Sequence, residues 1–480
     1  MPPIVEQDLI VARRYLSLLA LFDRVLPHAR LVSVLAPWIP ATRRERLLPA
    51  EITLQLVIAM NLYARDALTL VLSKLFLAVG LEQTSQVALP CSSAITQARQ
   101  RLGIGPVHAL FHQLCVPLAT PATPSAFLGG LRLMAIDAST EVVADTPANT
   151  RAFGKHHNQY GSSAFPLVQV VYLLECGTHA IIDAMIRPGH AHPLDLARRL
   201  VRSVRPDMLV LLDRGLTQWP VLACLQERGA PVLGRVQDER LLPPLRGYPD
   251  GSYLARFYRD PPSRRTARTP FVLVRVLVYT LDLPDWPQVG QTSRLITTLL
   301  DADQYPARTL IAAYHERWEI EVAIDEVDTH LRPVGRPLRS KTPQLVIQEF
   351  FGLLIAHYLV RAEMLAAGTT TGHDPDRLSF THAIGIVQQA LPLAQLTSAT
   401  GRRHLHDRIS QILVRYHLPP RERRSNPRVV RRKSSKFPRK ASAHHGVSLR
   451  TPFLDAICPS GMGAALRPRA APFDPLPVAA

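Results

Sequence analysis

The chain has 480 residues, of which 47% are hydrophobic and 20% are charged. This length allows two or three domains with a large core, and the composition excludes a disordered or fibrous protein. An excess of 56 Lys and Arg over 38 Asp and Glu gives a net charge of +18, which favours a polyanionic partner, nucleic acid first and an anionic membrane surface second.

The five cysteines are dispersed, and no two have the spacing of a zinc module. An odd, scattered set of thiols favours a reducing cytoplasm over a disulfide framework. The N-terminus carries Glu6 and Asp8 ahead of any apolar run, unlike a secretory signal. Polar and charged residues interrupt the apolar region 52–81, so a buried helical pair explains it better than a membrane span. We therefore expect a cytoplasmic protein with no membrane segment.

Residues 1–125 are predicted to form an N-terminal helical domain, because apolar residues recur there at helical spacing. The pattern indicates helices over Leu9–Phe22, Leu54–Tyr63, Ala67–Ala78 and Ala94–Leu102. A stiff linker with three prolines between 117 and 124 follows and marks the domain boundary.

Between 126 and 237 strands alternate with helices, a pattern typical of a mixed α/β sheet flanked by helices. The hairpin signal Glu175–Thr178 separates two of the strands. We expect strands at Leu131–Asp137, Leu167–Leu174, Ala180–Ile186, Met208–Asp213 and Val232–Val236, and helices at Leu194–Val204 and Val221–Arg228.

Residues 238–303 are rich in proline and in β-branched residues and are predicted to form a β-rich insertion, with strands at Phe271–Leu281 and Arg294–Leu300. Residues 304–417 are predicted to be helical. One long helix is expected at Tyr305–Leu331, and another is expected to begin with Thr342 as N-cap and Pro343 at its first position and to reach Ala367.

The last segment, 418–480, differs in charge. Its part from Pro419 to Lys440 holds ten Lys and Arg against Glu422 alone, a net charge of +9. Such a segment cannot bury a core, so we expect it to be disordered when free. Contact with a DNA backbone, with an affinity that falls steeply as salt rises, is the role we favour for it.

Three acidic residues stand out because of their positions. Asp137 and Asp213 each close an apolar run that reads as a buried strand. Glu321 lies on the predicted helix 305–331, where a rotation of about 100° per residue places it at the edge of the buried face. That helix carries a polar stripe and an apolar stripe beside it. The polar stripe comprises Tyr314, Arg317, Glu321, Asp325 and Asp328, and the apolar stripe comprises Ile320, Ile324, Val327 and Leu331.

If these three carboxylates converge, they repel one another unless cations lie between them. Mg²⁺ prefers oxygen ligands and keeps several waters, so a half-open acidic pocket suits it. Two such ions can activate a water or a 3′-hydroxyl and stabilise the leaving oxygen of a phosphodiester. The pattern thus predicts metal-dependent cutting and joining of DNA. Among rival acids, Asp145 is expected to lie in a turn and Asp183 on an exposed strand position.

The spacing of Tyr314, Arg317 and Glu321 resembles the Tyr-x-x-Arg-x-x-x-Glu-x-x-x-x-x-x-Lys signature of DDE transposases of the insertion sequence four group. Asp137, followed by Asp145–Asn149 and Phe153-Gly154, resembles the first acid of that group. Leu212-Asp213-Arg214-Gly215 resembles the second. The resemblance extends from about residue 25 to residue 440.

The resemblance implies a ribonuclease-H-like catalytic core with Asp137, Asp213 and Glu321 as ligands of two Mg²⁺ ions, for which Mn²⁺ can substitute. It implies that Tyr314 and Arg317 contact phosphates at the transposon end. It also implies cut-and-paste transposition, in which the N-terminal helices bind terminal inverted repeats and a homodimer on double-stranded DNA brings the ends to target DNA.

The sequence departs from the signature at Asp328, which stands where the lysine is expected. We expect a nearby cation to replace the lysine in binding DNA, and the candidates are Arg332, Arg336, Arg339 and Lys341. Two other functions stay open. One is a catalytically decayed protein that only binds transposon ends, and the other is a general Mg²⁺-dependent nuclease.

Overall fold

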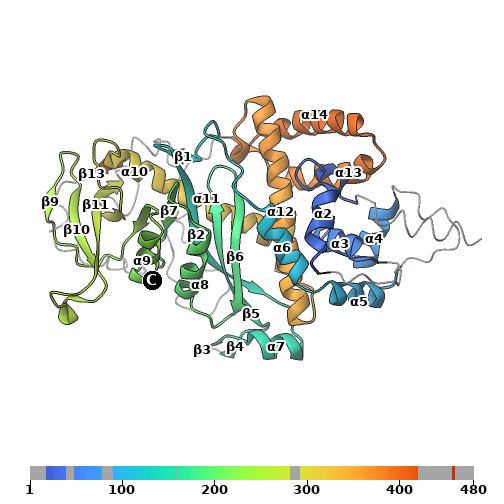
Figure 1. Cartoon of the computed structure of the whole chain (residues 1–480), viewed down its shortest axis with the longest axis horizontal. Coiled ribbons are helices and arrows are strands. Elements are labelled where there is room, and N and C mark those ends of the chain that lie inside the picture. The colour runs from blue at the N-terminus through green and yellow to red at the C-terminus, as the bar shows by residue number, and fades with distance from the viewer. Residues whose placement is uncertain are drawn as a thin grey trace, which may run out of the picture. The chain divides into compact units, whose positions relative to one another are not determined.

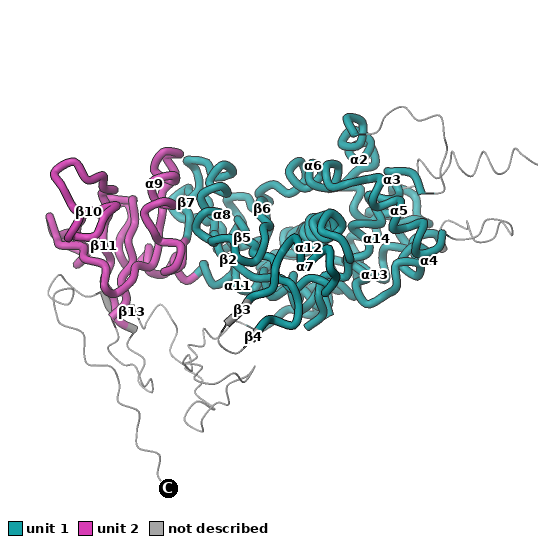
Figure 2. Tube along the Cα trace, turned by 90° about the horizontal axis from the view of Figure 1, so that it is seen from below, with its two compact units in different colours: residues 1–211, 316–421 teal, residues 212–315, 422–480 magenta. Residues whose placement is uncertain are grey.

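The computed structural model describes residues 18–38, 48–77, 90–158, 161–281, 292–333, 335–419 and 457–459. The chain divides into two compact units (Figure 2). Unit 1 comprises Met1–Leu211 and Glu316–Arg421, and unit 2 comprises Leu212–His315 and Glu422–Ala480. The basic segment Pro419–Lys440 lies outside the described residues except for Pro419. The predicted helix Leu9–Phe22 also lies mostly outside them, and its described end is a turn with a short 3₁₀ helix, Ala20–Phe22.

Unit 1 contains a sheet built around the long strand β2 (Leu131–Val142), with the order β6-β5-β2-β7 and β1 (Phe127–Leu128) beside β2. Strands β5 (Leu167–Glu175) and β6 (Ala180–Pro188) form the predicted hairpin. Both strands are buried along most of their length, as expected for β-branched runs that are covered on two faces. Strand β7 (Met208–Leu212) is fully buried, and the division between the units falls at its last residue.

Strand β2 is longer than the sequence indicated. We predicted that it ends at Asp137, but residues 138–142 continue the antiparallel pairing with β5, from Ala138 opposite Val171 to Val142 opposite Leu167. Continued pairing with β5 gives the backbone N–H and C=O groups of this polar stretch their hydrogen-bond partners. The sequence did not reveal this extension, because the apolar pattern stops at Asp137. Asp137 therefore lies inside a strand. Asp183 was also predicted wrongly as exposed, because its fully buried carboxylate on β6 binds the guanidinium of Arg202.

Among its described residues, unit 1 has ten α-helices around this sheet or in the adjoining helical part, in addition to the helix that follows residue 315. The central one is α12, a helix of 29 residues that contacts α3, α6 and α14 (Figure 1). The bounds are α2 (His28–Leu35), α3 (Ala50–Leu62), α4 (Leu68–Leu77), α5 (Ser92–Leu102), α6 (Gly105–Leu114), α7 (Pro147–Phe153), α8 (Pro193–Leu200), α12 (Pro343–Thr371), α13 (Phe380–Gln395) and α14 (Ala399–Arg415).

Helix α12 is the one helix in the described part of the chain that has the length and apolarity of a membrane span. Its most apolar window is 89% buried within the protein, so its apolar surface is covered by other helices. The predicted start at Thr342-Pro343 is confirmed, although the Thr342 side chain makes no capping hydrogen bond. The helix ends at Gly372, whose φ of +72° is the left-handed conformation that glycine adopts readily.

Unit 2 contains an antiparallel sheet with the order β8-β12-β11-β10-β9, and β13 (Ile457–Pro459) pairs with β11. The helices α9 (Trp219–Glu227) and α10 (Ala307–Tyr314) belong to the same unit. The strands are β8 (Val232–Arg235), β9 (Arg246–Gly247), β10 (Tyr253–Tyr258), β11 (Phe271–Leu281) and β12 (Ser293–Thr297). Strand β11 matches its predicted bounds, whereas β10 was not identified individually from the sequence.

The predicted single helix Tyr305–Leu331 consists of several helical types in succession. Helix α10 is followed by a 3₁₀ turn, His315–Arg317, then by α11 (Trp318–Asp325) and by a π-helical segment, Glu326–Leu331. A 3₁₀ helix has fewer residues per turn than an α-helix, and a π-helix has more. The angular positions predicted at about 100° per residue therefore hold only within α11. The mixed α/β fold with N-terminal helices is confirmed, while the predicted domain boundaries stay predictions.

Candidate active site

Asp137 and Glu321 are brought together in unit 1 by one arginine. Arg317, in the 3₁₀ turn before α11, donates from Nη2 to Glu321 Oε1 at 2.9 Å and from Nη1 to Asp137 Oδ2 at 3.4 Å. The side chain of Arg317 is 15% exposed, that of Asp137 18% and that of Glu321 33%. Strand β2 and helix α11 thus place two carboxylates, 184 positions apart in the sequence, on one guanidinium at a partly open surface.

The electrostatics of this group suit a hard cation. Two carboxylates face one guanidinium, which leaves an excess of one negative charge among the three. The second oxygen of Asp137, Oδ1, accepts the backbone N–H of Ala138 at 2.7 Å, which fixes the plane of its carboxylate. Partly exposed carboxylate oxygens are the ligands that Mg²⁺ prefers, because the ion keeps several waters. The residues present therefore fit a divalent cation at this place.

Asp213 lies in unit 2 directly after β7, the strand beside β2 in the sheet order. Its Oδ1 accepts the backbone N–H of Leu216 at 2.7 Å, and its carbonyl accepts the hydroxyl of Thr217 at 2.6 Å. A Cβ at Gly215 would lie 3.3 Å from Asp213 Oδ2, so the glycine keeps space beside the carboxylate. The turn thus orients Asp213 through its own neighbours in the sequence.

Tyr314 is buried at the end of α10, and its hydroxyl donates to the carbonyl of Leu212 at 3.1 Å. The contact ties α10 to the residue that precedes Asp213 within unit 2. The resemblance implied a phosphate contact for Tyr314. The observed contact instead gives this side chain a positioning role, and the phosphate contact stays a prediction.

Two family models match the chain and together cover most of it. One, described as the N-terminal domain of the insertion element 4 transposase, matches residues 17–112, and the other, described as a transposase DDE domain, matches residues 128–359. The transposase InsG for insertion sequence element IS4 of Escherichia coli K12 is 29% identical over 406 residues, which cover 83% of this chain and 88% of that protein. This chain belongs to the IS4 family of DDE transposases.

Two further similarities are more distant. A putative transposase of Escherichia coli K12, InsZ, is 27% identical over 210 residues, which cover 44% of this chain and 68% of that protein. Among solved structures, a synaptic complex of the piggyBac transposase with hairpin DNA has a TM-score of 0.43 and 13% identity and covers 84% of this chain and 86% of that one. The function of this IS4-family chain is DNA transposition, an enzymatic activity of DNA cleavage and strand transfer in which the family uses divalent metal ions.

The departure of this IS4-family member from the signature lysine has a structural counterpart. Asp328 lies in the π-helical segment next to Glu141 of β2 and Arg332. Burial first, and then the neighbouring Glu141 carboxylate, raise the pKa of Asp328 to about 9. Asp328 is therefore protonated at neutral pH. The position is partly buried, with the Asp328 side chain 26% exposed, and its location beside the Glu141 carboxylate favours the neutral form of the carboxyl group.

Arg332 does not have the exposure expected of a replacement for that lysine. It is 8% exposed, its guanidinium binds the Glu141 carboxylate, and Nη2 donates to the carbonyl of Arg336 at 2.9 Å. A buried carboxylate requires such a partner, and this requirement accounts for the inward orientation. These contacts give Arg332 a role in stabilising unit 1 from within, and its expected contact with DNA stays a prediction.

Of the other three candidate cations, one is held by backbone carbonyls of the protein and two are exposed. Arg339 donates from Nη1 to the carbonyl of Asp66 at 2.8 Å and also binds the carbonyl of Met60, so it ties residues 332–341 to the end of α3. Arg336 and Lys341 are exposed. Arg336 and the exposed Arg65 line a cavity of about 270 Å³ in unit 1.

Glu141 was not recognised from the sequence pattern as the partner of Asp328. A usable signal was present, because residues 137, 139 and 141 of a strand point to one face and Glu141 therefore lies on the same face as Asp137. The obstacle was the predicted end of the strand at Asp137, which removed Glu141 from the strand altogether.

Proposed function

We propose that this chain is a cut-and-paste transposase in which Asp137, Asp213 and Glu321 hold two Mg²⁺ ions at the scissile phosphodiester. The observation that supports the proposal best is the convergence of Asp137 and Glu321 on the guanidinium of Arg317. The resemblance of the sequence to the family signature implies that these residues are the first and third acids and that Asp213, directly after β7, is the second.

The protein's own groups have distinct tasks in this proposal. Asp137 and Glu321 provide carboxylate oxygens from a strand paired with β5 and from helix α11, so regular secondary structure positions both before DNA binds. Divalent ions, when bound there, would activate the attacking water or 3′-hydroxyl and stabilise the leaving 3′-oxygen. Arg317 then no longer has to neutralise both carboxylates, and its fork of donors can bind a phosphate of the transposon end.

The acid residues are tested by isosteric amide variants. Asp137→Asn, Asp213→Asn and Glu321→Gln should each reduce nicking of a supercoiled donor plasmid in Mg²⁺ by at least about 100-fold, as expected when a group that stabilises the transition state is lost. Binding to a labelled terminal repeat should remain within about threefold of the unaltered protein, since one added charge changes the backbone attraction little. The exposed Asp195→Asn in α8 is the matched control and should cleave normally.

Retained nicking in any of the three acid variants would remove that residue from the proposed ligand set. Loss of DNA binding together with nicking would indicate a folding defect, which thermal unfolding of the same preparation identifies. Nicking by Mn²⁺ at a comparable rate is expected, because the proposed ligands are all carboxylates.

The DNA partners follow from the same proposal. The N-terminal helices would bind terminal inverted repeats, and a homodimer would hold two ends before strand transfer to target DNA. The exposed cations Arg65, Arg336 and Lys341 are candidates for backbone contacts, and the +9 segment Pro419–Lys440 would add a salt-dependent contribution. We place this activity in the bacterial cytoplasm at the nucleoid, where such DNA is found.

A Mg²⁺-dependent nuclease without specificity is the second candidate, favoured only by the fact that the carboxylates alone do not select a sequence. Cleavage of plasmids with and without the terminal repeats separates the two, since a transposase cuts at the repeat ends.

A further inference from the structure

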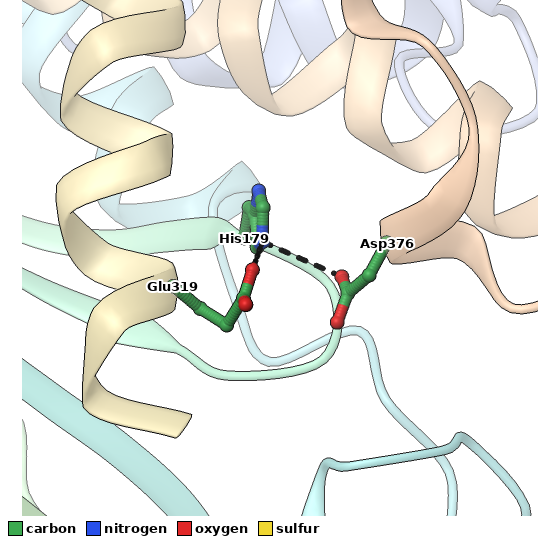
Figure 3. A group of neighbouring side chains, drawn as sticks. All are labelled: His179, Glu319 and Asp376. Carbon is green, nitrogen blue, oxygen red and sulfur yellow. Dashed lines mark hydrogen bonds and ion pairs between the residues drawn. The ribbon is translucent and has the colours of Figure 1, made fainter. Parts of the chain in front are cut away.

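A second group of metal-ligating side chains lies in unit 1, on elements that are remote in sequence (Figure 3). His179 is in the turn between β5 and β6, Glu319 is on α11, and Asp376 is in the 3₁₀ turn Pro375–Arg377. The Nε2 atom of His179 lies 2.6 Å from Glu319 Oε2 and 3.4 Å from Asp376 Oδ1. The His179 side chain is fully buried, and those of Glu319 and Asp376 are 15% and 11% exposed.

The other ring nitrogen of His179 is held by a second set of buried groups. Its Nδ1 lies 3.2 Å from Glu326 Oε1, and Glu326 in turn binds His357 Nε2 at 3.0 Å and Arg361 Nε at 2.8 Å. A carboxylate that accepts from one imidazole nitrogen fixes the ring and directs the lone pair of the other nitrogen toward a metal. Nε2 donates to Glu319 Oε2 at 2.6 Å, and the guanidinium of Arg361 also contacts Nδ1. A metal ion would displace the Nε2 proton, so that the lone pair of this nitrogen would face two carboxylates.

The charges of this group do not balance without a further cation. Three carboxylates, those of Glu319, Glu326 and Asp376, face one guanidinium, that of Arg361, which leaves an excess of two negative charges when His179 is neutral. Protonation of His179 removes only one of them, whereas a divalent ion at Nε2 removes both. Buried charges are tolerated when they are paired or bind metals.

A separate observation indicates the same missing partner. The Oδ1 atom of Asp376 is buried, faces His179 and receives no hydrogen bond. Buried acceptors without donors are rare in folded proteins.

We propose that His179, Glu319 and Asp376 bind one Zn²⁺ ion that stabilises the fold and is distinct from the catalytic ions. One imidazole nitrogen and two carboxylates are typical zinc ligands at about 2.0–2.2 Å, whereas Mg²⁺ favours oxygen alone. The three ligand atoms already lie within 4.8 Å of one another. Tetrahedral ligands at such bond lengths are about 3.4 Å apart, so the short contact between His179 and Glu319 opens by about 1 Å when the ion enters.

The ion would join the β5–β6 turn, α11 and the turn before α13. Glu319 and Glu321 are two residues apart on α11, so their side chains are separated by about 200° around the helix axis. Glu319, the zinc ligand on α11, therefore lies on the face of this helix opposite to the face that carries the proposed catalytic acid Glu321. The ion would hold α11 against the rest of unit 1.

The test measures zinc in the full-length protein. Protein stripped of metal, given two equivalents of Zn²⁺ and dialysed should retain about one ion per chain by elemental analysis. Asp376→Asn, which keeps the shape of the side chain, should weaken zinc binding about 10- to 100-fold. Asp325→Asn, an exposed acid on the same helix, and Asp137→Asn at the proposed catalytic site should both retain the ion. Loss of zinc in Asp137→Asn would place the ion at the catalytic site and overturn the proposal.

A measurement on the unaltered protein covers the case in which Asp376→Asn does not fold. X-ray absorption at the zinc edge should show a shell of nitrogen and oxygen near 2.0–2.1 Å with the signature of a single imidazole. A sulfur shell, two or more imidazoles, or the absence of retained zinc would each overturn the proposal, as would equal zinc affinity in folded Asp376→Asn. Nicking activity enters none of these readouts, so the outcome is independent of the proposed triad.

Discussion

Replacing Asp328 by asparagine should stabilise the protein, and increasingly so as the pH rises. The reason is the position of the carboxyl group beside the Glu141 carboxylate, which favours its neutral form. Asparagine is neutral at every pH, and its amide can donate to the Glu141 carboxylate as the protonated acid does. The variant therefore keeps the contact and removes the cost of protonating Asp328 on folding.

The magnitude follows from the pKa, which is raised from 3.8 in the unfolded chain to about 9 in the fold. Because the folded value is the higher one, the contribution of Asp328 to stability is fully present below pH 3.8 and is lost as pH rises toward 9. At 1.36 kcal/mol per pH unit, the loss by pH 7 is at most about 4 kcal/mol. Because Asp328 interacts closely with the Glu141 carboxylate and is partly exposed, we expect about 2–4 kcal/mol for Asp328→Asn at pH 7.

The assay is thermal or denaturant unfolding of both proteins from pH 6 to pH 9. The stability difference should widen by up to about 1.4 kcal/mol per pH unit and level off above pH 9. Asp195→Asn, an exposed acid in α8, should show no such trend. A constant difference between the variant and the unaltered protein across this range would refute the assignment of a neutral Asp328. Asp328→Lys, which restores the signature residue, should instead cost about 3–5 kcal/mol, because it adds a buried cation beside Arg332.

Two further outcomes concern the cations and the tyrosine of the signature. Arg332→Met should lower stability by about 3–5 kcal/mol, because it leaves the buried Glu141 carboxylate without its cationic partner. Arg336→Met should change stability by less than about 0.5 kcal/mol and should reduce the slope of log affinity against log salt by about one. Equal stability of the two variants would contradict the burial of Arg332. Tyr314→Phe should cost about 1 kcal/mol for the lost bond to Leu212 and lower the nicking rate without weakening DNA binding; unchanged unfolding would show that this bond does not contribute.

The sequence was sufficient to predict the features that rest on hydrophobic pattern. The strands around Asp137 and Asp213, the β5–β6 hairpin and the apolar helix that became α12 all have strong local signals. The family signature then placed Glu321 on a helix, and the contact of Arg317 with Asp137 and Glu321 is what a site built from these elements needs.

Features that depend on partners distant in sequence were not predictable in this way. The extension of β2 beyond Asp137 depends on pairing with β5, since residues 138–142 lack an apolar alternation of their own. The inward orientation of Arg332 depends on Glu141, which is 191 positions earlier in the chain. The π-helical segment 326–331 brings the buried Glu326 to Arg361. No local pattern in the sequence predicts the change from α-helical to π-helical geometry at this point.

The aspartate at the signature lysine position does not by itself indicate a decayed enzyme. In its protonated form Asp328 is neutral, and Arg332 balances Glu141, so the three side chains carry no net charge in the interior. A lysine in that place would leave one unbalanced cation, which shows that the surroundings of Asp328 are adapted to an acid. In a chain that had only lost its lysine, a complementary arrangement of Asp328, Glu141 and Arg332 would not be expected. Any lost phosphate contact must then be supplied by exposed cations such as Arg336, which the salt dependence of its variant will measure.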